Sequence, residues 1–488
     1  MMPLYNAKQS QAIDHHLIHA CATPSFLLMK RAAWHSWQTL NRLYPQTTEL
    51  HILCGNGNNG GDGFMLAQYA LLSGCSVTVY RLSDKPLKND ALKAWQEWQM
   101  LESTPIKSVF DFDILAAQHH SETVVVDALL GTGFQGELTP KLCAFIAQLN
   151  QAELNICALD CPTGLNVNTG NLQPNALKAQ HTFSFLTQKF GFYTQAGPDV
   201  CGQIHYFDLG SHKALTHFSP QAYSHGFEYW QTHLPRRAAQ FHKGNAGRAL
   251  LIGGNHSMMG AIQLSASAAL HSGCGFSQVI TRSEHITALT SQQPELMCFD
   301  SQSLPSKVKQ CDVIAIGTGL GQDAWAQALY QTVLEQTQWL VVDADALNLL
   351  AQQPRQRPNW ILTPHPGEAA RLLNCSTTQI QNDRIAAIKQ LHQRYGGIVV
   401  LKGNGTLIYD GQILELCPLG NPGMASAGMG DVLTGLICGL LAQGMPPLAA
   451  ACLGVYWHAA TADSLYQQFG SAGVLPSRII QNLAVLKG

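Results

Sequence analysis

Charged side chains are scarce in this chain of 488 residues. Asp, Glu, Lys and Arg together make up 12%, about half the share that is usual in globular proteins. The 29 basic and 31 acidic residues nearly cancel, which excludes a nucleic-acid-binding protein because such a protein needs a basic excess. Hydrophobic residues make up 46%, which excludes intrinsic disorder because the chain has apolar surface to bury.

Metal-binding and membrane-spanning motifs are also missing. The 14 cysteines form no CxxC pair and the 20 histidines no HExxH, so we expect no zinc site and predict reduced thiols in a cytoplasmic protein. The N-terminal segment lacks the compact apolar run of a targeting signal. The longest stretch without Asp, Glu, Lys or Arg, from Val432 to Ala462, contains Pro446-Pro447, which leaves two pieces of about 14 residues where a membrane span needs about 20. We therefore predict two buried helices there and no membrane partner.

What the chain does have is a regular alternation of short apolar segments and helical stretches, an order typical of α/β folds with mostly parallel sheets. In the first half the predicted strands are Leu50–Cys54, Ser76–Tyr80, Thr123–Asp127 and Asn155–Asp160. In the second half they are Ala249–Ile252, Asp312–Ile316, Trp339–Asp343, Asn359–Thr363, Gly397–Leu401 and Thr406–Tyr409. Between Ser211 and Gly247 the periodicity fades, so we predict two domains, residues 1–215 and residues 225–488.

A glycine-rich run in the first half, Cys54 to Gly63, lies between a predicted strand and the predicted helix Gly63–Ser73. It contains GxGxxG, and in that setting backbone N–H groups and a helix N-terminus can hold a phosphate. Two further predicted strands end in an acid, Asp127 and Asp160, and the carboxyl ends of parallel strands meet in one crevice. The pattern therefore predicts a polar pocket with phosphate donors, carboxylates and a cation. The alternative is that the two acids only cap the turns that follow them.

The runs GNGNNGGDG, VDALLGTG and LDCPTGLN resemble the epimerase domain of NAD(P)H-hydrate repair enzymes, over about residues 1–212. The resemblance implies a Rossmann-like fold that interconverts the R and S forms of hydrated NADH and NADPH, with Asp160 as acid or base. It implies a potassium ion surrounded by Asn59, Asp127 and Thr163. The substrate contacts that it implies are Asn58, Asn59, Gly60, Gly61, Asp62, Gly131, Thr132, Gly133, Phe134, Gln135, Gly136, Glu137 and Asp160.

Two positions around this site are open. Lys189 either assists the reaction or is a surface lysine. The segment Met29-Lys30-Arg31 stands where the family usually shows an acid after the methionine, and we assign the difference to packing or oligomer contacts rather than to chemistry.

A second glycine-rich run, Asn421 to Asp431, precedes the apolar stretch Val432–Leu441. Glycines that lead into a helix make an anion hole, because free N–H groups and the helix dipole point at one place. The run is not a Walker A loop, since no Gly-Lys-Ser/Thr follows. Asp431 is placed to take a proton from a hydroxyl nucleophile, and the alternative is a carboxylate that caps the helix.

The runs NPGMASAGMGDVLTG and TPHPGE resemble the ADP/ATP-dependent NAD(P)H-hydrate dehydratase within the ribokinase-like fold, over about residues 225–488. The resemblance implies that Asp431 deprotonates the hydroxyl of the hydrate, whose oxygen attacks the terminal phosphoryl group of ADP or ATP in the presence of Mg²⁺. The implied contacts with the hydrated nicotinamide are Ala261, Gly319, His365 and Asp431. Those with the nucleotide are Lys402, Gly403, Asn404, Gly405, Thr406 and Gly430.

Three alternatives to this bifunctional enzyme remain open at the level of sequence. One is a dehydrogenase that uses GxGxxG with Asp84 as the ribose-binding acid about 20 residues on. Another is a vitamin or sugar kinase with a regulatory first half, and a third is a dinucleotide-sensing module without activity. The choices between ADP and ATP and between hydrated NADH and NADPH stay open too, as does assembly into a homo-oligomer.

Overall fold

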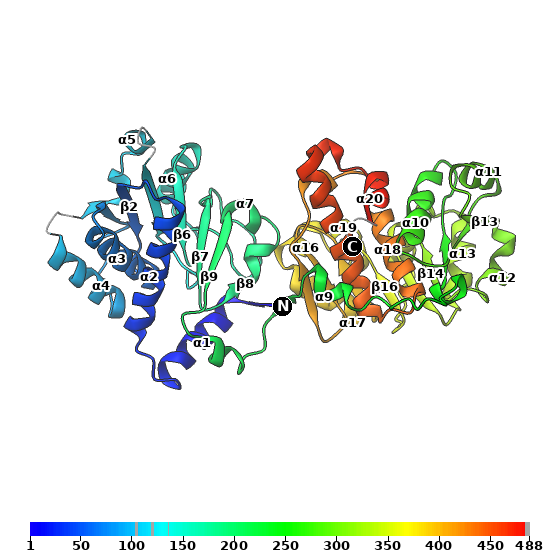
Figure 1. The fold of residues 1–488 in the computed structure, drawn as a ribbon, viewed down its shortest axis with the longest axis horizontal. Coiled ribbons are helices and arrows are strands. Elements are labelled where there is room, and N and C mark those ends of the chain that lie inside the picture. Colours follow the sequence, from blue (N-terminus) through cyan, green and yellow to red (C-terminus); the bar gives the residue numbers. More distant parts are fainter. Residues whose placement is uncertain (103–105, 119–121, 135, 484–488) are drawn as a thin grey trace. The chain divides into compact units, whose positions relative to one another are not determined.

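The structure is a computed structural model that describes residues 1–102, 106–118, 122–134 and 136–483. The chain folds into two compact units, Met2–Ala222 and a second that begins at Tyr223 (Figure 1). Each unit is a layered α/β structure. All fourteen cysteines fall within the described residues, and none of them forms a disulfide.

The first unit is built on a parallel sheet with the strand order β4-β3-β2-β5-β6-β7-β9. Its strands are β2 (Glu49–Cys54), β3 (Ser76–Arg81), β4 (Lys107–Ser108), β5 (Thr123–Ala128), β6 (Asn155–Leu159), β7 (His181–Phe185) and β9 (Gln203–Phe207). The short strands β1 (Met2–Tyr5) and β8 (Gln188–Lys189) pair with each other in parallel. The chain builds outward from β2 in one direction and then from β5 in the other, so a topological switch point lies between β2 and β5.

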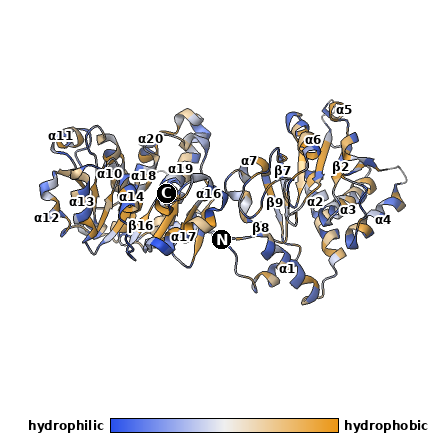
Figure 2. Cartoon of the chain, turned by 180° about the vertical axis from the view of Figure 1, so that it is seen from behind, coloured by the Kyte–Doolittle hydropathy of each residue, from blue (hydrophilic) through white to orange (hydrophobic). Residues whose placement is uncertain are grey.

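Helices cover both faces of this sheet, which explains why its central strands are apolar throughout. Ile52 and Val126 belong to the core beneath α2 (Ser25–Leu43) and α3 (Asn58–Leu72), whereas Leu53 and Val125 belong to the core beneath α6 (Pro140–Gln151). The strands are accordingly among the most hydrophobic segments in Figure 2. The remaining helices are α1 (Ala7–His19), α4 (Asn89–Leu101), α5 (Ile114–Gln118), α7 (Gly197–Cys201) and α8 (His212–Leu215).

The predicted start of the first glycine-rich helix is wrong by five residues. The sequence predicts a helix from Gly63, but α3 begins at Asn58, with Gly57 as its N-cap, so Asn58 and Asn59 lie in its first turn. Close backbone approach explains the glycines: a Cβ on Gly55 would lie 1.7 Å from the carbonyl oxygen of Leu129, and one on Gly60 would lie 2.0 Å from that of Gly55. Glycines that allow this close backbone approach have no apolar side chain, so the start of α3 lacks the helical hydrophobic periodicity from which a helix is predicted.

The second unit contains a larger sheet with the order β13-β12-β11-β14-β15-β16-β17-β18-β19-β10. It is parallel except where β18 pairs with β17 and β19. The strands are β10 (Ala222–Ser224), β11 (Arg248–Ile252), β12 (Phe276–Ile280), β13 (Met297–Phe299), β14 (Val313–Ile316), β15 (Trp339–Val342), β16 (Trp360–Leu362), β17 (Ile398–Leu401), β18 (Thr406–Tyr409) and β19 (Leu414–Cys417). The helices that carry the site are α10 (Met259–His271), α14 (Ala344–Gln352), α15 (Pro366–Leu373), α18 (Met429–Ala442) and α19 (Pro447–Phe469). The others are α9 (Phe227–Gln231), α11 (Ser283–Gln292), α12 (Leu304–Lys307), α13 (Ala324–Leu334), α16 (Thr377–Asn382), α17 (Arg384–Tyr395) and α20 (Pro476–Asn482).

The prediction of two buried helices around Pro446-Pro447 is confirmed. α18 ends at Ala442, α19 begins at Pro447, and both contribute to the largest apolar core of the second unit. No helix in the described part of the chain is long and apolar enough to cross a membrane.

Two candidate active sites

A cavity of about 610 Å³ opens in the first unit where β2, β5 and β6 end. The predicted substrate residues that line it are Asn58, Asn59, Asp62, Gly131, Thr132, Gly133, Phe134 and Asp160. Four predicted substrate residues do not line the cavity: Gly60 and Gly61 in the first turn of α3, and Gly136 and Glu137 in the loop after β5. Gln135 lies outside the described residues. Two loops and a helix start that are far apart in sequence therefore meet at one site.

Asp160, directly after β6, forms an ion pair at the wall of this cavity. Its Oδ1 lies 2.9 Å from Nζ of Lys189, and its Oδ2 accepts a hydrogen bond from the Thr132 N–H at 2.8 Å. Burial alone would raise the pKa of Asp160, but the Lys189 ammonium and the Thr132 N–H outweigh it and the pKa is lowered. The Lys189 side chain is only 1% exposed, so the surface-lysine alternative is wrong. Asp160 is thus held as a carboxylate.

Two other carboxyl groups in the same cavity are shifted in the opposite direction. Burial and the negative charge of Asp160 raise the pKa of Asp62 well above its usual value. Burial and Asp160 also raise the pKa of Asp14, which comes from α1 and carries no sequence signal that identifies it. The cavity therefore holds an ionised carboxylate beside two carboxyl groups whose pKa is raised, an arrangement suited to proton transfer.

The residues implied as potassium ligands lie around the segment that follows β5. Asp127 is fully buried; its carboxylate accepts hydrogen bonds from the N–H and hydroxyl of Thr163, both at 2.8 Å, and burial raises its pKa to about 6. The Leu130 N–H donates to the Thr163 hydroxyl. Asn59 is buried, and neither polar atom of its side chain has a partner among the described residues. Hard oxygen donors and an unsatisfied amide fit a monovalent cation.

The unusual segment Met29-Lys30-Arg31 packs around this unit's helices. The Met29 side chain lines the cavity and fills the space that a Cβ on Gly61 would need, since the Met29 methyl carbon would lie 2.6 Å from it. Lys30 lies 3.2 Å from Glu97 on α4, and Arg31 donates to the carbonyl of Leu209. Both basic side chains therefore have partners within the unit.

The second site forms around Lys402, at the carboxyl end of β17. Its Nζ lies 2.8 Å from Asp343 at the end of β15 and 3.8 Å from Glu368 in the first turn of α15. A Cβ on Gly430 would lie 3.3 Å from the same Nζ, so the start of α18 comes close to the ammonium. The Thr434 hydroxyl donates to the other oxygen of Asp343. The sequence alone assigns no role to Asp343 or Glu368, although Asp343 ends a predicted strand and Glu368 belongs to the run TPHPGE.

Asp431 is the third residue of α18 and does not cap it. Gly428, with φ of 96°, occupies the N-cap, and within the described residues no side chain caps this helix. Burial, followed by the charge of Asp343, raises the pKa of Asp431 to about 7, although Lys402 opposes the shift. A carboxyl group with this pKa can accept and release protons near neutral pH.

His365 caps α15 and completes this side of the site. The ring Nδ1 accepts a hydrogen bond from the Gly367 N–H, and the backbone N–H of His365 donates to the Glu368 carboxylate. Burial and the Lys402 charge lower the pKa of His365, which keeps the ring neutral. Arg384 holds the turn Lys402–Thr406 in place, because its guanidinium donates hydrogen bonds to the carbonyls of Leu401, Lys402 and Asn404.

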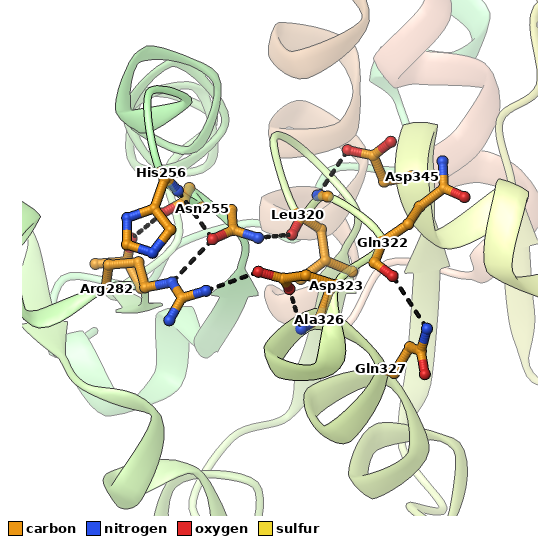
Figure 3. A network of polar contacts seen from close by, with 12 residues as sticks. Asn255, His256, Arg282, Leu320, Gln322, Asp323, Ala326, Gln327 and Asp345 are labelled. Carbon is orange, nitrogen blue, oxygen red and sulfur yellow. Dashed lines mark hydrogen bonds and ion pairs between the residues drawn. The ribbon is translucent and has the colours of Figure 1, made fainter.

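A polar network fixes the glycine turn that carries Gly319 (Figure 3). Asn255 donates to the Leu320 carbonyl at 2.9 Å and accepts from Arg282, which also reaches Asp323. A Cβ on Gly319 would lie 3.1 Å from the Ala261 Cβ, so these two predicted substrate residues are neighbours. The structure thus brings together Ala261 with Gly319, and Asp431 and His365 with Lys402.

These two units define a two-domain α/β enzyme, with a dinucleotide-type site in the first unit and a phosphoryl-transfer-type site in the second. The family model described as "NAD(P)H-hydrate dehydratase" matches residues 249–484, and the one described as "YjeF-related protein N-terminus" matches residues 25–191. The chain is 39% identical to the bifunctional NAD(P)H-hydrate repair enzyme of Coxiella burnetii over 100% of its own length and 99% of that protein. It is 40% identical to that of Escherichia coli, with 93% of this chain and 88% of the other covered. The chain belongs to the family of bifunctional NAD(P)H-hydrate repair enzymes.

Solved structures support the fold of the ribokinase-like domain. A ribokinase-like superfamily protein from Enterococcus faecalis is 34% identical, with a TM-score of 0.51, and covers 54% of this chain and 94% of its own. An ADP/ATP-dependent NAD(P)H-hydrate dehydratase from Bacillus subtilis, co-crystallised with ATP and Mg²⁺, is 30% identical, with a TM-score of 0.50, and covers 55% of this chain and 99% of its own. The predicted fold class and family are thereby confirmed, against the dehydrogenase, kinase and sensor alternatives.

Proposed function

We propose that this chain repairs hydrated NADH and NADPH in two steps. The first unit interconverts the R and S hydrates, and the second dehydrates the S form with ADP or ATP. The observation that carries the proposal is that Asp160 and Asp431, in two separate sites, have environments suited to two different proton-transfer tasks. The test is to incubate the purified protein with mixed hydrate epimers, with and without ADP. Reduced-nicotinamide absorbance should return fully only with ADP.

Epimerisation requires that the ring hydroxyl leave one face and that water add to the other. A protonated carboxyl, for which Asp62 is suited by its raised pKa, would donate a proton to the departing hydroxyl. The ring nitrogen supplies the electron pair that stabilises the resulting cation. Asp160 would take a proton from the water that adds to the opposite face, and Lys189 keeps it ionised for this task. Water is consumed and released in equal amounts, so the substrate composition does not change.

Potassium fits the first site, and Asn59, Asp127 and Thr163 would hold it. When bound, the cation would supply a counter-charge for the buried Asp127. These residues also hold the segment from Leu129 to Gly131, since the Leu129 N–H donates to Asp127 and Gly131 lies against Asn59. The ion would therefore act through the position of the loop that borders the substrate.

Replacing Asp127 with alanine should slow epimerisation at least about tenfold and abolish its response to potassium, because even the loss of a group that supports a metal ligand typically costs about 10–100-fold. The rate would be measured at constant ionic strength with potassium replaced stepwise by sodium. Dehydration by the second unit of the same protein serves as the control for folding. An unchanged rate with an unchanged potassium response would leave Asp127 as a turn-capping residue.

Dehydration requires that a poor leaving group be converted into a good one. Asp431 would accept the proton of the ring hydroxyl, and the oxygen would attack the terminal phosphoryl group of ADP, releasing AMP. Phosphate then leaves the ring carbon with the electrons of its C–O bond while a proton leaves the neighbouring carbon, which restores NAD(P)H. Lys402, Gly430 and the turn Gly403–Thr406 would bind the nucleotide phosphates, and Ala261, Gly319 and His365 the hydrated ring.

The described side chains of the second site do not form a set of free ligands for magnesium. Both oxygens of Asp343 are engaged, by Lys402 and Thr434, and Glu368 accepts the His365 N–H. No group of three or more His, Cys, Asp or Glu side chains in the described ranges is arranged to hold a metal. Any Mg²⁺ would be bound mainly by the nucleotide phosphates, as is common for this ion.

The two activities should survive separation of the units. β10 pairs with β19, and the His225 side chain lies 2.7 Å from the buried Glu415, so a second fragment that began at residue 225 would lose β10. Fragments 1–221 and 222–488 preserve these contacts. We expect the first to epimerise and the second to dehydrate the S hydrate, each within a few-fold of the whole chain. Insolubility of both fragments would contradict the proposed division.

A further inference from the structure

A second cleft lies beside the substrate cavity of the first unit. It has a volume of about 790 Å³ and shares Leu82 and Ser83 with the cavity. The Ser83 hydroxyl also accepts a hydrogen bond from Asn56, in the glycine-rich turn, at 2.8 Å. The cavity and the cleft therefore adjoin at Leu82 and Ser83.

The strand order places the cleft where the other half of a dinucleotide would lie. In doubly wound sheets a dinucleotide spans the switch point, with one nucleotide over each half of the sheet. Here Asp160 follows β6 on one side of the switch point, whereas the cleft is formed by the end of β3, by β4 and by residues of α4 and α6 on either side. With the hydrated ring at Asp160, the adenosine half points toward β3 and β4.

The lining of the cleft is rich in cations and contains unpartnered donors. Arg81, Lys107 and Lys141 lie in it, with Asp84 and Glu102 as the two carboxylates. Arg81 donates from one terminal nitrogen to the Lys85 carbonyl at 2.7 Å, which fixes its side chain.

Two residues that line the cleft each have a buried N–H group without a partner within the described part of the chain: Nε of Arg81 and Nε1 of Trp95. The ring of Phe110 lies 3.9 Å from the Lys141 ammonium. Cations beside aromatic rings and free donors suit a phosphorylated nucleoside.

We propose that this cleft, called here the β3–β4 cleft, binds the adenosine ribose of the hydrated dinucleotide and that Arg81, Lys107 and Lys141 bind its 2′-phosphate. The epimerase unit would then prefer hydrated NADPH to hydrated NADH. This inference rests on the proposed function of the first unit. The position of Arg81 supports a phosphate rather than a hydroxyl. It is the last residue of β3, about 20 residues after the GxGxxG run, where an acid would bind a free 2′-hydroxyl and an arginine a 2′-phosphate. Asp84 stands beyond the strand end.

The test measures kcat/KM for epimerisation of both hydrates by the full chain without ADP or ATP, so that no dehydration occurs. Pure S hydrates of NADPH and NADH are converted separately, and the approach to the epimer mixture is followed by chromatography. In Arg81→Ala the ratio of kcat/KM for the NADPH hydrate to that for the NADH hydrate should fall about 10- to 100-fold, the range of one to two charge-assisted hydrogen bonds.

A second variant guards against damage to the loop that Arg81 holds. Lys107 and Lys141 are exposed, so the double variant Lys107→Ala with Lys141→Ala should fold normally and lower the same ratio about three- to tenfold. Lys178→Ala removes an exposed lysine of the same unit outside the cleft and should leave the ratio unchanged. The inference would be overturned if the ratio stayed unchanged in both cleft variants, even if kcat/KM fell equally for the two hydrates. The proposed function would still stand in that case. A wild-type protein that epimerises neither hydrate would overturn the proposed function itself.

Discussion

Replacing Asp431 with asparagine is expected to lower the rate of dehydration at least about 100-fold, because general-base steps contribute about 10²–10⁴-fold. Asparagine has the size of aspartate but cannot accept the hydroxyl proton. Gly428 rather than Asp431 occupies the N-cap of α18, so the helix start does not depend on the carboxylate. Epimerisation by the first unit of the same protein should continue, which gives each assay an internal control.

The dehydration rate of the wild type should also depend on pH in a defined direction. The pKa of Asp431 is raised to about 7, so kcat/KM should rise as the pH rises through this value and the base becomes ionised. The residual rate of the asparagine variant should lack this rise. A variant that turns over within a few-fold of the wild type would reject Asp431 as the base.

Stability should respond in the opposite sense to activity. A carboxyl group whose pKa is raised by folding costs stability when it ionises, so its unfavourable contribution grows as the pH rises from its usual 3.8 toward about 7 and is complete above that pH. Asparagine removes that cost. At pH 8 the variant should therefore melt no lower than the wild type, and a clear loss of melting temperature would show that Asp431 has a structural role as well.

The sequence predicted most of the central strands because they are buried on both faces and read as continuous apolar runs. The strands that it missed include β7, β9, β12, β13 and β19. The sequences of β9 and β12, QIHYF and FSQVI, mix polar with apolar residues although Ser277 and Gln278 are buried. Burial of those polar groups depends on neighbouring strands, and a single segment contains no information about them.

The site was predictable where glycine-rich runs or strand-end acids mark it, as at Asp160, Asp431 and Lys402. Asp14 was not, because α1 reaches the cavity only through tertiary packing. Asp343 ends a predicted strand, but its ion pair with Lys402 depends on β16 lying between β15 and β17. Lys189 was ambiguous for the same reason, since its burial follows from the pairing of β8 with β1.

Replacing Asp160 with asparagine should reduce epimerisation at least about 100-fold and also destabilise the first unit. The variant loses the base, and it leaves the ammonium of Lys189, whose side chain is 1% exposed, without its counter-charge. Breaking a buried ion pair on one side costs about 3–5 kcal/mol, whereas replacing both partners is often neutral. A lower melting temperature should therefore accompany the loss of activity.

The double variant Asp160→Asn with Lys189→Met separates these two effects. It removes both charges, so the melting temperature should return toward that of the wild type while epimerisation stays lost. The pH dependence gives a further check. The pKa of Asp160 is lowered below its usual 3.8, so its contribution to stability is complete above that pH and is lost as the pH falls through the lowered value. The difference in melting temperature between wild type and Asp160→Asn should thus be full at pH 7 and shrink in acid. Recovery of epimerisation in the double variant would show that Asp160 serves the fold and not the reaction.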